Sequence, residues 1–266
     1  MPTVKKDFNL EDKIALVTGA TGHLGQEIAI GLASAGAHVL VNSRTKGKAK
    51  KTVLLIKKLG HSAEIANFDI TKNKEVNTFF TKYKNKLNVL VNNAYLGTAY
   101  GTIETSSADQ FRQSYETSLV ASHNLLRLSL PSLRKAVLKD GEASVINISS
   151  MYGMVSPDLS LYNSTKTSSP PFYGAAKAAL IQFTKYAAIE FGKEKIRVNT
   201  ITPGPFPSYK TQKKNPSFIK RLNKKVPLGR IGRESELRGP VIFLASNASS
   251  YVNGANLVVD GGWTAW

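Results

Sequence analysis

Short apolar runs alternate with amphipathic stretches along most of the chain. Runs rich in Val, Ile, Leu and Ala, which favour buried β-strands, occupy residues 13–18, 38–41, 63–68, 87–91, 144–148 and 196–201. Apolar residues recur at helical spacing over 24–35, 46–59, 72–84, 108–130 and 175–191. Residues 241–245 continue a further helix, and residues 256–259 are predicted to form a seventh strand. This alternation predicts a parallel sheet with helices on both faces.

We therefore expect one α/β domain, a doubly wound Rossmann fold with a mostly parallel seven-stranded sheet, over residues 13–266. Residues 1–12 are predicted to be an N-terminal extension. In the helix predicted over 46–59, Val53, Leu54, Ile56 and Leu59 are expected on one side. A proline-interrupted segment, residues 203–226, lies between a strand and a helix, where long loops often carry function.

The amino-acid composition excludes several kinds of functional site. The 266 residues are 42% hydrophobic, enough for a core that needs no metal or disulfide staple. There is no cysteine, which excludes disulfides, zinc–thiolate sites, iron–sulfur clusters and a cysteine nucleophile, and is compatible with a reducing compartment. The histidines at positions 38, 61 and 123 show no metal-ligand spacing. We therefore propose no metal.

The net charge of the chain bears on which partners it attracts and says nothing about its fold. The chain carries 36 Lys and Arg against 18 Asp and Glu, a formal charge of +18. Such a charge attracts nucleic acids and anionic membranes, but no helix-turn-helix, zinc-finger or aromatic RNA-binding signature accompanies it. The first 12 residues hold no apolar stretch of signal-peptide length, and no apolar run reaches membrane-spanning length. We expect a cytoplasmic protein with no specific nucleic-acid partner and no membrane.

A glycine-rich turn joins the first predicted strand to the first helix. In such a turn, glycines let the backbone approach a pyrophosphate, whose charge the helix N-terminus favours. The candidate cofactor residues here are Thr18, Gly19, Thr21, His23, Leu24 and Gly25. The second strand is followed by Ser43 and Arg44, with no acid for a ribose 2′-hydroxyl. Arg44, helped by Lys46 or Lys48, favours NADP(H) over NAD(H).

Several separated motifs together resemble the short-chain dehydrogenase/reductase family over residues 13–262. After the glycine turn come Asp69-Ile70, Asn92-Asn93-Ala94, Ser149-Ser150, the Tyr173 to Lys177 motif, Arg197-Val198-Asn199, Pro203-Gly204 and Val259-Asp260-Gly261-Gly262. The resemblance implies that Asp69, Ile70, Asn92, Asn93, Ala94, Tyr173, Lys177, Pro203 and Gly204 contact the dinucleotide. It also implies a homotetramer and oxidation or reduction at CH–OH groups.

Tyr173 and Lys177 are four residues apart, so on a helix they share one face. An ammonium beside a phenol favours the phenolate and so assists acid–base catalysis. The resemblance implies that Tyr173 exchanges the proton, that Lys177 also holds the nicotinamide ribose, and that Ser150 steadies the substrate oxygen.

A second tyrosine–lysine pair, Tyr162 and Lys166, has the same spacing. Tyr162 follows Ser150 by 12 residues, close to the family's usual separation, whereas Tyr173 follows it by 23. Pro170 and Pro171 block a helix running on from Tyr162, while a long helical pattern follows Tyr173. We therefore choose Tyr173 and Lys177, which leaves an insertion, residues 155–172, beside the active site.

Two positions depart from the family pattern. His23 stands where the turn usually has its middle glycine, and we expect its side chain to contact a phosphate. Counting back from Pro131, Ser118 falls where an asparagine usually serves the proton relay. Ser118 can still hold a water, so we expect a slower or rewired relay, although a loss of catalysis is the alternative.

The segment 203–226, here called the basic lid, carries seven bases and no acid between positions 210 and 225: Lys210, Lys213, Lys214, Lys220, Arg221, Lys224 and Lys225. A basic lid concentrates anionic substrates. Residues 227–230 and 256–266 resemble gluconate 5-dehydrogenase-like enzymes, and residues 151–173 resemble reductases of surface-glycan or flagellin modification. Together with the basic lid, this resemblance favours an anionic sugar-derived substrate. A 3-oxoacyl-carrier reductase, a catalytically silent dinucleotide sensor and a nucleic-acid-binding protein are the alternatives.

Overall fold

The structure, a computed structural model, describes residues 4–95 and 100–265. In these residues seven parallel strands form one sheet in the order β3-β2-β1-β4-β5-β6-β7. The strands are β1 (Ile14–Val17), β2 (His38–Asn42), β3 (Ala63–Ala66), β4 (Val89–Asn92), β5 (Ala143–Ile148), β6 (Ile196–Pro203) and β7 (Asn256–Val259). The predicted doubly wound α/β fold is confirmed. Strand order reverses between β1 and β4, where folds of this class bind ligands at the carboxyl ends of their strands.

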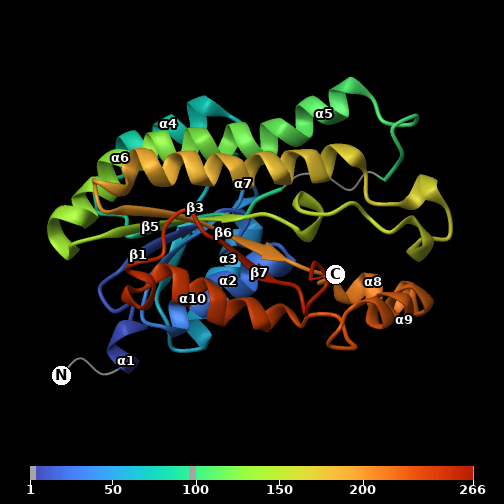
Figure 1. Ribbon diagram of the computed structural model, residues 1–266. Helices are drawn as coiled ribbons and strands as arrows, with labels where there is room; N and C mark the ends of the chain where they lie inside the picture. Colours follow the sequence, from blue (N-terminus) through green and yellow to red (C-terminus); the bar gives the residue numbers. More distant parts are fainter. Residues whose placement is uncertain (1–3, 96–99, 266) are drawn as a thin grey trace.

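Helices cover both faces of the sheet (Figure 1). On one face lie α2 (His23–Ser34), α3 (Lys46–Lys58) and α10 (Arg238–Ala245), and on the other lie α4 (Asn73–Lys82), α5 (Ala108–Tyr115), α6 (Ala121–Asp140) and α7 (Pro171–Gly192). Strands β4, β5 and β6 are buried along their whole length, as expected for central strands that helices cover on both faces. The even and odd residues of β1 pack into different apolar clusters, one on each face.

In helix α3, the prediction that four apolar residues share one buried side is correct for two of them and wrong for the other two. Val53 and Ile56 are buried as expected, but Leu54 is 56% exposed and Leu59 is 51% exposed. The buried side of α3 continues through Ala49 instead, because positions 49, 53 and 56 share one side at 3.6 residues per turn.

Helix α6 extends ten residues beyond the predicted boundary at 130, passing through Pro131 to Asp140. Proline removes one backbone donor and usually disfavours a helix interior. Here Leu133 and Ala136 are fully buried beyond it, so packing of the helix against the sheet outweighs that cost.

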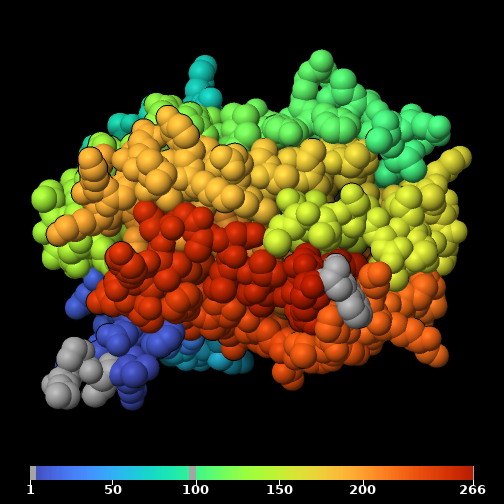
Figure 2. Space-filling view, viewed as in Figure 1, coloured from blue at the N-terminus to red at the C-terminus, as the bar shows by residue number. Residues whose placement is uncertain are grey.

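The basic lid folds into two short helices, α8 (Tyr209–Lys214) and α9 (Pro216–Lys225). They lie at one end of the molecule beside the insertion, which contains short 3-10 turns at Leu159–Leu161 and Thr165–Thr167 (Figure 2). Leu161 packs there in a separate apolar cluster with Met151, Leu222, Val226 and Trp263. The lid and the insertion therefore share a small core of their own.

The N-terminal segment also joins the domain. After the short helix α1 (Val4–Asp7), Leu10 is 1% exposed and its N–H donates to the carbonyl of Ala35. The apolar core thus begins before residue 13. Even the longest helices of the described chain, α6 and α7, lack a stretch apolar enough to cross a membrane.

Candidate active site

A cleft opens at the carboxyl ends of β1, β2, β4 and β5 and gathers most of the predicted site residues. The predicted residues that line it are Gly19, Thr21, His23, Leu24, Gly25, Ser43, Arg44, Asp69, Ile70, Asn93, Ala94, Tyr173 and Lys177. The lining does not include Thr18, Asn92, Ser118, Ser150, Pro203 and Gly204.

The turn after β1 is built to bring backbone close to a ligand. Gly19 has a φ of +60°, and a Cβ at this position would lie 2.9 Å from Cα of Ala94. A Cβ on Gly25 would collide with the carbonyl of Gly19. The N-cap of α2, Gly22, supplies no side-chain oxygen, so it does not compete for the first-turn N–H groups. The turn therefore fits the pyrophosphate of a dinucleotide.

Thr18 and Asn93 hold this turn in place. The Thr18 hydroxyl donates to the carbonyl of Val91 and accepts from the N–H groups of Asn93 and Ala94 at 2.9 and 3.1 Å. The amide of Asn93 donates to the carbonyl of Thr18 at 2.8 Å. Thr18 itself is fully buried, so it ties β1 to β4 and leaves the cleft wall to Asn93 and Ala94.

Asn92 differs from the expected cofactor contact. Its side chain is 4% exposed and donates to the side-chain oxygen of Asn147 at 2.8 Å, across the β4–β5 pair. This asparagine therefore lies inside the sheet, because it is the last residue of β4 and its side chain points toward the neighbouring strand.

Positively charged side chains line the part of the cleft that follows β2. Arg44 and Lys48 line it, whereas Lys46 does not. The Ser43 hydroxyl accepts from that of Thr21 at 3.4 Å and from the N–H of Thr45. Two cations beside a serine hydroxyl fit an adenosine 2′-phosphate.

Asp69 and Ile70, which follow β3, also line the cleft. One oxygen of the Asp69 carboxylate accepts from the N–H and the hydroxyl of Thr71 at 3.0 and 2.8 Å. Asp69 thereby fixes the turn that follows β3, while α4 takes Lys72 as its N-cap.

Tyr173 and Lys177 project from the first turns of α7. Pro171 starts this helix, and its N–H-free ring suits the first helical position. The Lys177 side chain is 4% exposed, and its Nζ donates to the carbonyl of Ile148 at 2.8 Å. Burial lowers the pKa of Lys177 to about 8. Burial also raises the pKa of Tyr173 to about 12, although a hydrogen bond with Ser150 opposes this rise.

Ser150 and Ser118 are buried and are not part of the cleft lining. The hydroxyl of Ser150, in addition to its contact with Tyr173, accepts from the N–H of Tyr152 at 3.2 Å. Ser118 lies in a π-helical turn, Glu116–Val120, that joins α5 to α6. Its Oγ is buried and has no hydrogen-bond partner among the described residues. An unpartnered buried hydroxyl in a π-turn is typical of a functional position.

His23, Pro203 and Gly204 have protein partners in this structure. The two ring nitrogens of His23 lie 3.1 Å from the carbonyl oxygen of Phe206 and 3.4 Å from a carboxylate oxygen of Glu234. Its expected phosphate contact stays a prediction. Pro203 ends β6 opposite Val259, and the N–H of Gly204 donates to the carbonyl of Val259. These two residues form a support for the C-terminal strand.

The alternative pair, Tyr162 and Lys166, does not share a helix face. Tyr162 follows a 3-10 turn, and its hydroxyl lies 3.0 Å from that of Tyr152. Its ring packs against Phe218 of the lid at 5.5 Å, while Lys166 is exposed in the next 3-10 turn.

Two bases of the lid bind the insertion. Arg221 donates to the carbonyl of Leu161 at 2.7 Å and to the side chain of Asn163 at 2.9 Å, and Lys225 pairs with Asp158 at 3.2 Å. The exposed bases of the lid are Lys210, Lys213, Lys214, Lys220 and Lys224. The expected attraction of anions therefore rests on these five lysines.

Tyr95 and Ser149, which were not among the predicted site residues, also line the cleft. The Ser149 hydroxyl donates to the carbonyl of Lys177 at 2.9 Å and so fastens α7 to the end of β5. Tyr95 follows Asn93-Ala94 directly, and its position beside that motif was the available signal. Its phenol ring packs against that of Tyr173 with centroids 5.0 Å apart.

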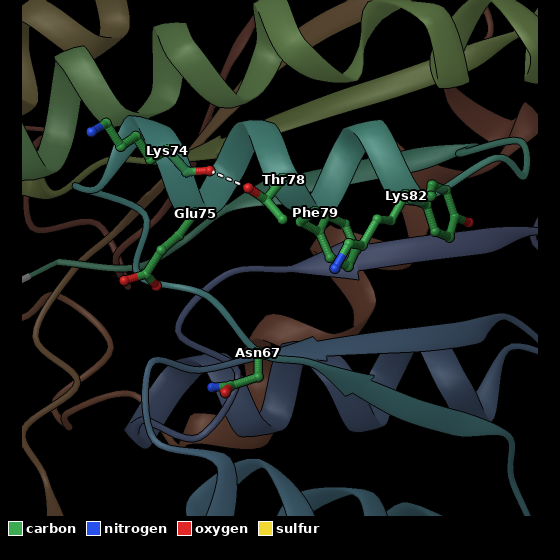
Figure 3. Close-up of a pocket in the computed structure, with 7 residues that line it drawn as sticks. Asn67, Lys74, Glu75, Thr78, Phe79 and Lys82 are labelled. Carbon is green, nitrogen blue, oxygen red and sulfur yellow. Dashed lines mark hydrogen bonds between the residues drawn. The ribbon is translucent and has the colours of Figure 1, made fainter.

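A second hollow lies beside α4 (Figure 3). Its Glu75 carboxylate accepts from the N–H of Asp69 at 2.8 Å and pairs with Lys72 at 3.1 Å, so it supports a local turn. Phe79 and Tyr83 stack on each other with centroids 5.6 Å apart. The hollow thus has a structural explanation, and the predicted chemistry gathers in the other cleft.

Comparison with known proteins agrees with the geometry. The profile of the family described as "Enoyl-(Acyl carrier protein) reductase" matches residues 19–264. A 2-dehydro-3-deoxy-D-gluconate 5-dehydrogenase of Dickeya dadantii is 32% identical, with 97% of this chain and 98% of the relative covered. A rhamnolipid-biosynthesis 3-oxoacyl-[acyl-carrier-protein] reductase of Pseudomonas aeruginosa is 31% identical over 96% of this chain and 98% of its own.

A crystal structure similar to this one is that of a gluconate 5-dehydrogenase from Burkholderia cenocepacia in complex with NADP and tartrate. The TM-score is 0.87 at 28% sequence identity, with 99% of this chain and 100% of the other covered. The similarity therefore extends over the whole fold, including the glycine turn and the helix that carries Tyr173 and Lys177.

Proposed function

We propose that this chain, which belongs to the short-chain dehydrogenase/reductase family, transfers a hydride between NADP(H) and a ketone or secondary alcohol of an anionic, sugar-derived substrate. It is an NAD(P)-dependent oxidoreductase that acts on CH–OH groups. The observation that carries the proposal is the placement of Tyr173 and Lys177 together on the wall of a cleft whose other end holds a glycine turn and Arg44.

Different residues of the cleft would bind different parts of the dinucleotide. The turn Gly19–Gly25 would hold the pyrophosphate, and Arg44, Lys48 and Ser43 would hold a 2′-phosphate, for which a bidentate guanidinium is well suited. Asn93, whose amide donates to the carbonyl of Thr18, would keep that turn in shape, and Lys177, beside Tyr173, would bind the nicotinamide ribose. When bound, the cofactor supplies or accepts the hydride.

Tyr173 moves the proton. In reduction, its phenol donates a proton to the carbonyl oxygen as the carbon gains a hydride, so a C=O bond becomes CH–OH and a phenolate remains. The Lys177 ammonium stabilises that phenolate, and Ser150 holds the substrate oxygen beside the phenol. Ser118 would hold the water through which the phenolate regains its proton.

The ionisation of this pair gives the pH dependence a direction. With a pKa of about 12, Tyr173 is protonated at neutral pH and ready to donate. Lys177, with a pKa of about 8, loses its charge first as the pH rises. Reduction should therefore decline as the pH rises above about 8, because the phenolate then forms without its neighbouring cation.

An anionic sugar-derived substrate is supported by the gluconate dehydrogenase relatives and by the exposed lysines of the lid. A 3-oxoacyl-carrier reductase is the second candidate, supported by the rhamnolipid-biosynthesis relative. We also propose a cytoplasmic homotetramer. Leu138 on α6 and Tyr186 and Ile189 on α7 are 89%, 69% and 85% exposed, which supports an interface between subunits on this face.

The test compares two tyrosine variants in NADPH-dependent reduction of sugar keto acids, with a 3-oxoacyl thioester as the competing substrate. Tyr173→Phe should lose about 100-fold or more in kcat, the scale of a general acid, and still bind NADPH. Tyr162→Phe should keep both properties. Equal losses in the two variants would refute the assignment, and NADPH binding by the wild type without turnover of any substrate would favour a silent sensor.

A further inference from the structure

The side chain of Tyr95 lies against both members of the proposed catalytic pair. The Nζ atom of Lys177 lies over the Tyr95 ring, 5.2 Å from its centroid. The ring of Tyr173 meets Tyr95 edge to face, with an interplanar angle of 65°. Tyr95 follows β4 and lines the cleft, so it contacts the pair from a different element than α7.

Two hydrogen bonds fix the orientation of the Tyr95 ring. Its hydroxyl lies 3.1 Å from Oγ of Ser114 on α5, and that hydroxyl in turn donates to the carbonyl of Phe172 at 3.0 Å. Ser114 is 2% exposed, so this link from β4 through α5 to the start of α7 is shielded from water. The ring is therefore held at both its Cβ end and its hydroxyl end.

The Lys177 ammonium has few other partners for its charge. Among the described residues, its Nζ donates a hydrogen bond to a single backbone carbonyl, that of Ile148 at the end of β5. The titratable side chains that face it are Tyr95, from the segment after β4, and Tyr173, on α7 itself, whose ring centroid lies 5.9 Å from Nζ. In the described residues no carboxylate is paired with Lys177, although a buried ammonium needs compensation.

We propose that Tyr95 is a positioning residue whose aromatic face holds the charged Lys177 side chain beside Tyr173. The proposal rests on the proposed function and adds to it, because neither the glycine turn nor the tyrosine–lysine motif assigns a role to this position. The ring quadrupole attracts a cation at this distance, most strongly where water is excluded. The Tyr95 hydroxyl serves only to orient the ring through Ser114.

This role predicts different effects from removing the ring and from removing the hydroxyl. Loss of the ring withdraws a stabilising partner from the ammonium, so the pKa of Lys177 should fall further below its present value. The free energy of a desolvated cation–π contact corresponds to a fall of about 0.5 to 1.5 in the pKa of Lys177. Loss of the hydroxyl alone leaves the ring packed against that of Tyr173, so the aromatic face still meets the ammonium and the pKa of Lys177 should change little.

The experiment measures the pKa of Lys177 directly in the cofactor-free protein. Protein labelled with [ε-13C]lysine is titrated from pH 6 to 11 by NMR, and the Lys177 signal is assigned by its absence in Lys177→Arg. Tyr95→Leu and Tyr95→Met remove the ring, Tyr95→Phe keeps it, and Ser114→Ala removes the tether. Circular dichroism tests whether each variant is folded. Two aliphatic replacements are made so that the experiment can still be read if one of them fails to fold.

We expect the Lys177 pKa to fall in Tyr95→Leu and Tyr95→Met and to stay within about 0.3 units of wild type in Tyr95→Phe. In the loaded enzyme, the alkaline limb of kcat for reduction should move by the same amount, giving about a 3- to 30-fold loss at pH 9 and little loss at pH 6.5. An unchanged Lys177 pKa in both aliphatic variants would overturn the proposal, as would an equal fall in Tyr95→Phe.

Failure of the proposed function would leave a different signature. A wild-type protein that reduces no carbonyl would contradict the enzymatic proposal while the NMR titration still reports on the contact between Tyr95 and Lys177.

Discussion

Replacing Lys177 with methionine should make the protein more stable at neutral pH while abolishing its activity. The Lys177 side chain is 4% exposed, and its surroundings lower the pKa from 10.5 to about 8. The native state therefore holds an ammonium that it disfavours, whereas the unfolded chain hydrates it freely. Methionine is similarly long and unbranched, so it fills the same space without the charge.

The magnitude follows from proton linkage. At 1.36 kcal/mol per pKa unit, the lowered pKa corresponds to a destabilisation of about 3 kcal/mol at pH 7. The variant also loses the hydrogen bond to the carbonyl of Ile148, which lowers its free energy of unfolding by about 1 kcal/mol. Lys177→Met should therefore raise the free energy of unfolding by about 2 kcal/mol at pH 7.

The sign of the pH dependence is specific to this lysine. Between pH 8 and 10.5 the unfolded state still binds the proton that the native state has released, so wild-type stability gains from Lys177 as the pH rises. The advantage of the methionine variant should thus be full below pH 8 and vanish between about pH 9.5 and 10. Above about pH 10.5 the wild type should be more stable by about 1 kcal/mol, because only the lost hydrogen bond then separates the two proteins.

Urea unfolding of both proteins at pH 7, 8.5 and 10, at one protein concentration, measures this difference, since other titrating groups cancel between the two. A methionine variant less stable than wild type at pH 7, or a difference that does not change with pH, would refute this explanation of the lysine's pKa.

Three further substitutions probe the cleft. Arg44→Ala should weaken NADPH binding by about 10- to 100-fold in calorimetry and leave NADH binding nearly unchanged, because only the 2′-phosphate loses a charge-assisted partner; equal losses would remove Arg44 from the site. Gly25→Ala should abolish binding of both nucleotides, since its Cβ would collide with the carbonyl of Gly19, and a normal affinity would show that the turn can adjust. Ser118→Ala should lower kcat with no loss of unfolding free energy, because its buried Oγ has no partner within residues 4–95 and 100–265. Lowered stability with unchanged kcat would assign it a structural role instead.

The fold could be predicted because most of its strands are short runs rich in apolar residues, and stretches with helical periodicity separate them. Strand pairing in one parallel sheet follows from that alternation, so the carboxyl-end location of the turn after β1 and of Asn93 follows as well. Periodicity failed where several registers fit equally well. In α3, apolar residues at 53, 54, 56 and 59 span more than one face, and only packing against the sheet selects 53 and 56.

Other features depend on contacts that sequence spacing does not encode. The continuation of α6 past Pro131 depends on burial of Leu133, and the π-turn around Ser118 leaves no recognisable pattern in the chain. The use of Arg221 and Lys225 to bind the insertion could not be foreseen, because it requires the lid and the insertion to meet at one end of the molecule. Tyr95 was missed for the same reason, since its partners lie on α5 and α7.

Calorimetric titration of the purified protein with NADPH and with NADH at moderate salt tests the central claim most directly. A dinucleotide in the cleft, with Arg44 and Lys48 at its adenosine end, predicts saturable binding of both nucleotides and tighter binding of NADPH. Binding of neither nucleotide would contradict the assignment of the cleft, and tighter binding of NADH would contradict the role given to Arg44.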